Sequence, residues 1–111
     1  MVKKKLFEIF WSRDAEENLK NIYEHIKEGS QKNADKVVAE IVELSKSLVF
    51  SPFRYEECSE LPTKTKIYRK LTYRPYKIIY RVKTNRVEIL SVFHSSQNPK
   101  KISRLKKVKI R

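Results

Sequence analysis

The sequence predicts an α+β fold, in which an N-terminal helical hairpin covers one face of an antiparallel β-sheet. Two observations lead to this fold. Helical and strand patterns fall in separate runs, in the order strand, helix, helix, strand, strand, strand, instead of alternating along the chain. In addition, very short turns join the last three strand candidates, and connections of that length imply antiparallel neighbours. Because 111 residues suffice for one core, we expect a single domain over residues 1–111.

The N-terminal half predicts one strand and two helices. From Lys5 to Trp11 apolar side chains recur at every second position, which is typical of a half-buried strand. Ser12 then caps a helix whose apolar residues recur at helical spacing up to Gly29, the only glycine in the chain. A second amphipathic helix follows and ends before Pro52. The short turn between them predicts that the two helices pack antiparallel.

The C-terminal half predicts a loop, three strands and a basic tail. Residues 51–66 contain two prolines and three glutamates, which indicates an exposed loop. Strands are expected at 67–72, 76–83 and 87–94, with turns at 73–75 and 84–86. We expect Pro99 to end the ordered part. In residues 100–111, 7 side chains are Lys or Arg with apolar residues between them, so a short amphipathic helix or a frayed tail is expected.

The positive charge belongs to the C-terminal half of the chain. Residues 1–61 hold 10 Lys or Arg and 12 Asp or Glu, a net charge of −2, whereas residues 62–111 hold 16 Lys or Arg and one acid, Glu88, a net charge of +15. The two values add up to the net charge of +13 for the whole chain. A field of this strength attracts polyanions, such as nucleic acid or an acidic protein partner.

One face of the predicted sheet carries cations. In the strand 76–83, Lys77, Ile79, Arg81 and Lys83 share one side, and the alternate residues form the core side. With helices on the core side only, the other face is expected to stay open for a ligand. If Arg69 lies on the same side, it joins Lys77 and Arg81 in a patch suited to phosphates or acidic side chains. The alternative is that these cations only solvate an open sheet face.

Several classes of protein are excluded. One glycine allows neither a phosphate-binding loop nor a dinucleotide fingerprint, and His25, His94 and Cys58 lack zinc-ligand spacing, so we expect no cofactor and no metal. A single cysteine forms no internal disulfide and suits a reducing cytosol. No stretch approaches the roughly 20 apolar residues that a membrane helix needs. We therefore expect a cytoplasmic protein without a membrane partner.

A metal-free ribonuclease is compatible with the sequence. Such chemistry needs a base, an acid and cations that stabilise the pentavalent phosphate. Arg69, Lys77 and Arg81 are the candidate cations, and His94 is the candidate proton-transfer group, with Glu60 and Tyr73 as other possibilities.

The motifs and their order resemble the RelE/ParE family of toxins from type II toxin–antitoxin modules, and more closely its ParE-like branch. The resemblance covers almost the whole chain except the basic tail. It rests on Trp11-Ser12 followed by Ala15 and Leu19, on Leu48 to Pro52, on Tyr68-Arg69-Lys70-Leu71, on Tyr76 to Val82, and on Val92-Phe93-His94-Ser95-Ser96-Gln97-Asn98-Pro99.

The resemblance implies a small toxin that a cognate antitoxin, acidic and folding on binding, holds inactive. RelE-like members cut mRNA on the ribosome, whereas ParE-like members inhibit DNA gyrase. Ribonucleases of the family place an arginine at the position of Lys77 and a histidine or tyrosine pair at Ser95 and Ser96, so His94 falls one residue early. The ParE-like pattern often has an arginine near Ser96 or Gln97, which this chain lacks.

Three functional hypotheses follow. The first is a ParE-like toxin that inhibits gyrase and uses a binding surface made of Arg69, Lys77, Arg81, Lys83, Gln97 and Asn98. The second is a ribosome-dependent mRNA endoribonuclease with Arg69, Lys77, Arg81 and His94 as catalytic residues. The third is a nucleic-acid-binding protein or a degenerate toxin that retains only antitoxin binding.

Overall fold

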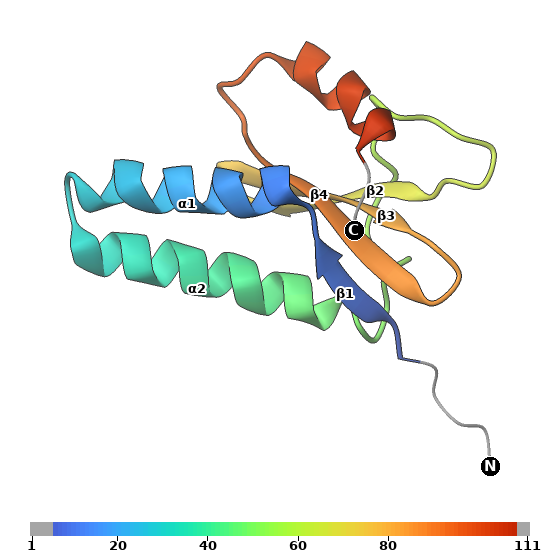
Figure 1. Ribbon diagram of the computed structural model, residues 1–111, viewed down its shortest axis with the longest axis horizontal. Coiled ribbons are helices and arrows are strands. Elements are labelled where there is room, and N and C mark those ends of the chain that lie inside the picture. Colours follow the sequence, from blue (N-terminus) through green and yellow to red (C-terminus); the bar gives the residue numbers. More distant parts are fainter. Residues whose placement is uncertain (1–5, 109–111) are drawn as a thin grey trace.

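The computed structural model describes residues 6–108, which form two helices, a four-stranded sheet and a C-terminal 3₁₀ helix (Figure 1). The elements are β1 (Glu8–Trp11), α1 (Arg13–Lys27), α2 (Gln31–Ser47), β2 (Tyr68–Tyr73), β3 (Tyr76–Val82), β4 (Arg86–His94) and η1 (Pro99–Lys107). The expected α+β fold and the order β-α-α-β-β-β are confirmed. The expected first strand included Lys5, which lies outside the described residues.

Serine caps set the start of both helices. Ser12 Oγ accepts a hydrogen bond from the Ala15 amide at 2.9 Å, and Ser30 Oγ accepts one from the Asn33 amide at 3.1 Å. Each bond satisfies an amide that has no partner inside the helix. Between them, the amides of Gly29 and Ser30 both donate to the Ile26 carbonyl, so the chain reverses directly and the two helices lie side by side (Figure 1).

The sheet has the strand order β1-β4-β3-β2. Strands β2, β3 and β4 are antiparallel neighbours, as their short turns predict, while β1 pairs parallel to β4. The sheet is therefore mixed, and the first strand of the chain is joined to the last. At the other edge, the amides of Cys58 and Lys70 take part in hydrogen bonds that tie the preceding loop to β2.

Both faces of the sheet are covered. The face toward the helical hairpin buries the larger core, to which β3 contributes Tyr76, Ile78, Tyr80 and Val82. A second core lies on the opposite face, where Ile79 and Leu90 pack against side chains of η1 and of the loop before β2, namely Cys58, Leu61, Ile102 and Leu105. The expectation of an open face was wrong, because the tail turns back over the sheet instead of leaving it.

The tail is more ordered than the sequence predicts, and the loop before β2 is less exposed, because it buries Cys58 and Leu61. Pro99 does not end the ordered part but opens η1, whose Ile102 and Leu105 are buried. Of the two alternatives for residues 100–111, the helix is observed as far as Lys107, and residues 109–111 lie outside the described range.

Within residues 6–108, none of the helices combines the length and the apolar character needed to cross a membrane.

Candidate functional site

The four candidate catalytic residues are divided between the two faces of the sheet. Directly opposite residues of neighbouring antiparallel strands point to the same side, and adjacent residues of one strand point to opposite sides. Arg69 pairs with Tyr80, whereas Arg81 pairs with Tyr68. Arg69 therefore lies on the face toward the helical hairpin, and Lys77 and Arg81 lie on the face toward η1. The expectation that Arg69 joins Lys77 and Arg81 in one patch was wrong.

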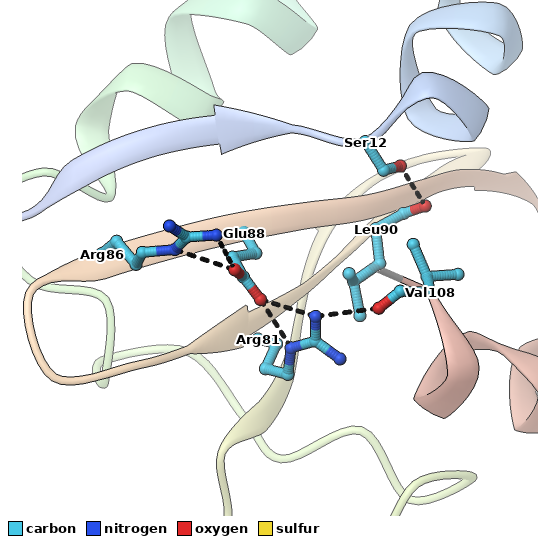
Figure 2. A network of polar contacts seen from close by, with 6 residues as sticks. All are labelled: Ser12, Arg81, Arg86, Glu88, Leu90 and Val108. Atoms are coloured by element: carbon cyan, nitrogen blue, oxygen red, sulfur yellow. Dashed lines mark hydrogen bonds and ion pairs between the residues drawn. The ribbon is translucent and has the colours of Figure 1, made fainter. Parts of the chain in front are cut away.

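Arg81 is a buried structural cation. Its side chain is buried between the sheet and η1, where its guanidinium pairs with Glu88 at 2.6 Å and donates to the Val108 carbonyl at 3.0 Å (Figure 2). Glu88 also accepts from Arg86, whose guanidinium lies 4.5 Å from the centre of the Phe10 ring. Burial opposes ionisation of Glu88, but hydrogen bonds from both arginines outweigh it and lower the pKa of the carboxyl.

Arg69 holds a loop in place. Its guanidinium donates to the carbonyls of Phe53 at 2.9 Å and Tyr55 at 2.8 Å, and its Nε donates to the Lys66 carbonyl at 3.1 Å. The same guanidinium stacks over the Phe53 ring, 5.0 Å from its centre. These contacts use the fork of donors that distinguishes arginine from lysine.

His94 organises the turn after β4. It pairs with Tyr76, and the two rings meet edge to face with 5.2 Å between their centres, which places His94 on the hairpin side of the sheet. Its Nδ1 accepts a hydrogen bond from the Ser96 amide at 3.0 Å, and its own amide donates to Gln97 Oε1 at 2.8 Å. His94 thus lies on the opposite face from Lys77 and Arg81.

A cationic pocket of about 460 Å³ lies where the β2–β3 hairpin meets the end of β4. Half-buried Lys77 lines it together with Lys70 and Arg74, which the sequence analysis did not single out. Thr72 and Ser95 add hydroxyl groups to the polar lining. Alternate residues of β2 point to the same face, and this alternation is the feature of the sequence that could have identified Lys70. Lys70, and not Arg69, shares a face with Lys77. Three cations and two hydroxyls are suited to binding an anionic group.

The lining of the cationic pocket offers little for proton transfer. Its one carboxylate, Glu56, lies 3.6 Å from Lys70 Nζ in an ion pair. Its one phenol belongs to Tyr76, whose pKa is raised by burial, so this side chain stays protonated at neutral pH. The arrangement can hold an anion, but it does not place a general base and a general acid on either side of it.

The other candidate binding residues are spread over the molecule. Lys83 is exposed at the opposite end of β3 from Lys77. Gln97 and Asn98 are exposed near the end of β4, and Asn98 Oδ1 also accepts from the Lys100 amide as the N-cap of η1.

An apolar groove runs between β1 and the helical hairpin, on the outer edge of the sheet. It has a volume of about 730 Å³ and is lined mostly by apolar and aromatic side chains of β1, α1 and α2, namely Ile9, Phe10, Trp11, Leu19, Tyr23, Val38 and Val42. Glu16 and Lys20 of α1 also line the groove. Strand β1 has a sheet neighbour on one side only, so backbone groups along its outer edge face this region.

The family model of the ParE toxin of the type II toxin–antitoxin system parDE matches residues 9–99, which include both helices and all four strands except Glu8. The chain belongs to the ParE toxin family. The resemblance deduced from the motifs is thereby confirmed, and the protein is a ParE-like toxin of a type II system. Among curated protein sequences, none matches this toxin.

Two solved structures have the same fold as the toxin. A chain of the chromosomal ParDE toxin–antitoxin system from P. aeruginosa is 27% identical, with a TM-score of 0.65, and the match covers 80% of the toxin and 96% of that chain. A chain of the toxin–antitoxin complex RelBE2 from Mycobacterium tuberculosis is 18% identical, with a TM-score of 0.61, and the match covers 86% of the toxin and 98% of that chain. At 18% identity the second likeness shows the fold alone.

Cys58 lies buried in the second core and away from these surfaces. Burial raises the pKa of the Cys58 thiol to about 11, and its Sγ lies 3.5 Å from Glu60 Oε1. In the part of the toxin that the structure describes, no three His, Cys, Asp or Glu side chains are grouped so that they could hold a metal ion.

Proposed function

We propose that this toxin inhibits DNA gyrase when free, that a cognate antitoxin neutralises it, and that it does not cut mRNA. The observation that carries the proposal is the division of Arg69, Lys77, Arg81 and His94 between two faces of the sheet. RNA cleavage requires a base, an acid and a cation around one phosphate. The paired strands separate the candidate base from two of the three cations.

The state of Arg81 supports the same conclusion. An arginine that stabilises a phosphate must present its guanidinium to the ligand, but Arg81 is only 7% exposed and is paired with Glu88. Freeing it for RNA would leave the Glu88 carboxylate buried with one partner fewer. A buried pair costs several kcal/mol to break, so ligand binding at Arg81 is strongly disfavoured.

For the target, we propose a contact surface around the cationic pocket, made of the half-buried Lys77 and the exposed Gln97 and Asn98. Lys77 in the cationic pocket and Gln97 and Asn98 beyond β4 lie toward one end of the sheet, and Lys83 lies at the other. The charge of +15 on residues 62–111 steers this half of the toxin toward an acidic surface.

For the antitoxin, we propose the apolar groove beside β1. A segment that folds on binding can place apolar side chains in the groove and pair its backbone with the outer edge of β1. An acidic antitoxin suits the net charge of +13 on the toxin. Since gyrase and newly made antitoxin are both cytoplasmic, we place the toxin in the cytoplasm.

Gyrase inhibition and mRNA cleavage are distinguished by measuring both with the same preparation of toxin. Purified toxin is added to a gyrase supercoiling assay and to a ribosome-bound mRNA whose cleavage is mapped by primer extension. We expect loss of supercoiling, intact mRNA and a weaker effect of Lys77→Glu, with Lys20→Glu on α1 as the matched control. Cleavage within codons that His94→Ala abolishes would overturn the gyrase proposal. Absence of growth arrest on induction would instead favour a degenerate toxin.

A further inference from the structure

The loop that follows α2 presents aromatic side chains to solvent. Phe50 is 56% exposed and Phe53 is 50% exposed, and together with Leu6, at 57%, they are the exposed large hydrophobic residues within residues 6–108. The chain segments that carry them lie together, because the Phe7 amide donates to the Val49 carbonyl at 3.0 Å and the Phe7 ring lies edge-on to Phe53, with 6.3 Å between ring centres. We call Leu6, Phe7, Phe50 and Phe53 the aromatic platform.

Hydrogen bonds from Tyr80 and Arg69 fix the backbone of the loop that carries the platform. The buried Tyr80 hydroxyl donates to the Pro52 carbonyl at 2.5 Å, which fixes the backbone between the two exposed phenylalanines. Arg69 fixes the next carbonyls, those of Phe53 and Tyr55, and covers one side of the Phe53 ring. A residue expected to bind phosphate therefore serves to present an aromatic side chain.

Rigid exposed aromatic groups are typical of protein interfaces. Exposed apolar side chains that cluster mark binding surfaces more often than single ones do. Pre-organised aromatic anchors bind with little loss of conformational freedom, and such residues are enriched among those that contribute most to affinity. Two phenylalanines on a fixed loop have both properties.

The charges around the platform select an acidic partner. Arg54 is exposed beside Phe53, and Arg69 lies against its ring. Of the three loop carboxylates, Glu56 is paired with Lys70, Glu57 Oε2 accepts from the Thr63 amide at 3.5 Å, and Glu60 Oε1 accepts from the Ser59 hydroxyl at 3.2 Å. A second copy of the toxin, with its net charge of +13, would be repelled, so self-association through this surface is disfavoured.

The platform is continuous with the apolar groove. Strand β1 starts immediately after Phe7, and its Ile9, Phe10 and Trp11 line the groove. From Phe7 to Trp11 an extended chain spans roughly 13 Å, so a partner segment of about five residues connects the two surfaces.

We propose that the aromatic platform is a second docking surface for the antitoxin, which receives an acidic segment with apolar side chains that continues along β1 from the groove. This inference rests on the proposed neutralisation by an antitoxin. It adds a contact outside the groove. In this proposal Arg54 binds the acidic segment of the antitoxin, and Arg69 holds the Phe53 ring in position for binding.

The test measures binding of the antitoxin encoded by the acidic reading frame next to the toxin gene, by titration calorimetry at low and moderate salt. Phe50→Ala/Phe53→Ala should weaken binding by at least roughly 30-fold, the loss expected for one interface anchor. Arg54→Glu should also weaken binding and reduce its salt dependence, whereas the matched control Lys106→Glu on η1 should change binding far less. Growth arrest by each platform variant should persist, and circular dichroism checks that each variant is folded.

Arg54→Glu keeps the inference testable if the double variant does not fold, because Arg54 lies on the surface. Unchanged antitoxin affinity in folded platform variants overturns the inference, and loss of gyrase inhibition in the same variants would assign the platform to the target instead. A groove variant, Val42→Asp, distinguishes the two proposals. If it abolishes antitoxin binding while the platform variants bind normally, only the platform inference fails. If wild-type toxin does not bind the antitoxin at all, both fail.

Discussion

Arg69 and Arg81 lie on opposite faces of the sheet, although Arg69 pairs with Tyr80, the residue next to Arg81. Because Arg69 pairs one residue away from Arg81, the two side chains point to opposite faces and have different roles. Arg81 closes the contact between the sheet and the C-terminal segment through Glu88 and the Val108 carbonyl, and Arg69 fixes the loop that carries Phe53. The two cations therefore stabilise different parts of the toxin, and neither is available as a free phosphate ligand.

Replacing Glu88 should destabilise the toxin strongly. Glu88→Gln leaves Arg81 buried without its carboxylate, and we expect the free energy of unfolding in urea to fall by about 3 kcal/mol. The control is Glu43→Gln, which removes an exposed pair with Lys46 and should cost less than about 0.5 kcal/mol. The double variant Arg81→Met/Glu88→Leu should lose less stability than Glu88→Gln, and the opposite order would contradict this account of the pair.

The stabilisation by Glu88 should depend on pH in acid. Its pKa in the folded toxin lies below the ordinary value of 4.5, so the folded state favours the ionised carboxyl. The contribution is fully present above the unfolded-state pKa and is lost as the pH falls through the folded-state pKa. The difference in unfolding free energy between wild type and Glu88→Gln should therefore be constant near neutral pH and shrink in acid. A difference that grows in acid would contradict the assignment.

The two serine caps should differ in their effect on stability. Ser12 is buried, accepts from the Ala15 amide and donates from its hydroxyl to the Leu90 carbonyl at 3.0 Å (Figure 2). The Ser30 side chain accepts the capping bond from the Asn33 amide at a partly exposed position. Ser12→Ala should lower the unfolding free energy by about 2 kcal/mol and Ser30→Ala by about 1 kcal/mol. Equal losses in thermal or urea unfolding would show that the bond to Leu90 contributes nothing.

Cys58 should resist alkylation in the folded toxin. The side chain is completely buried and its pKa is raised to about 11, so the reactive thiolate is scarce and inaccessible at neutral pH. Iodoacetamide should label it at a rate set by unfolding, and Glu88→Gln should speed the labelling by shifting the equilibrium toward the unfolded state. Rapid labelling of folded wild type, monitored by mass spectrometry, would place Cys58 at the surface.

The local patterns of the sequence predicted the two helices and the four strands, with ends that differ by a few residues from the observed ones, and left the C-terminal helix undecided. Ser12 caps the first helix as predicted, and apolar residues at every second position mark strands, because these signals depend on neighbours within one turn or one strand. The order of helices and strands then selected the fold class. These signals are local and carry no information on contacts between distant residues.

The composition of the candidate site depended on the register between β2 and β3, and the sequence did not predict that register. A turn placed at 73–75 leaves the pairing of the flanking strands undetermined, whereas the observed pairing of Tyr73 with Tyr76 makes a two-residue connection and puts Arg69 opposite Tyr80. One residue of difference exchanges the faces of a strand. The burial of the second face also depends on contacts between residues far apart in the chain. Ile102 and Leu105 of η1 pack against Ile79 and Leu90 of the sheet, and no local pattern predicts this contact.

The parallel pairing of β1 with β4 has a consequence for how the toxin is made. Glu8 is aligned with Arg86 and Trp11 with Ile89, so the first strand gains its neighbour only when the last strand exists. A chain still in synthesis can form the helical hairpin, but it lacks both inner strands that cover the apolar stripe of that hairpin. Contacts between such distant segments slow folding and make it cooperative. The complete sheet therefore forms only after nearly the whole chain has left the ribosome, and we expect products truncated before β4 to expose apolar surface to proteases.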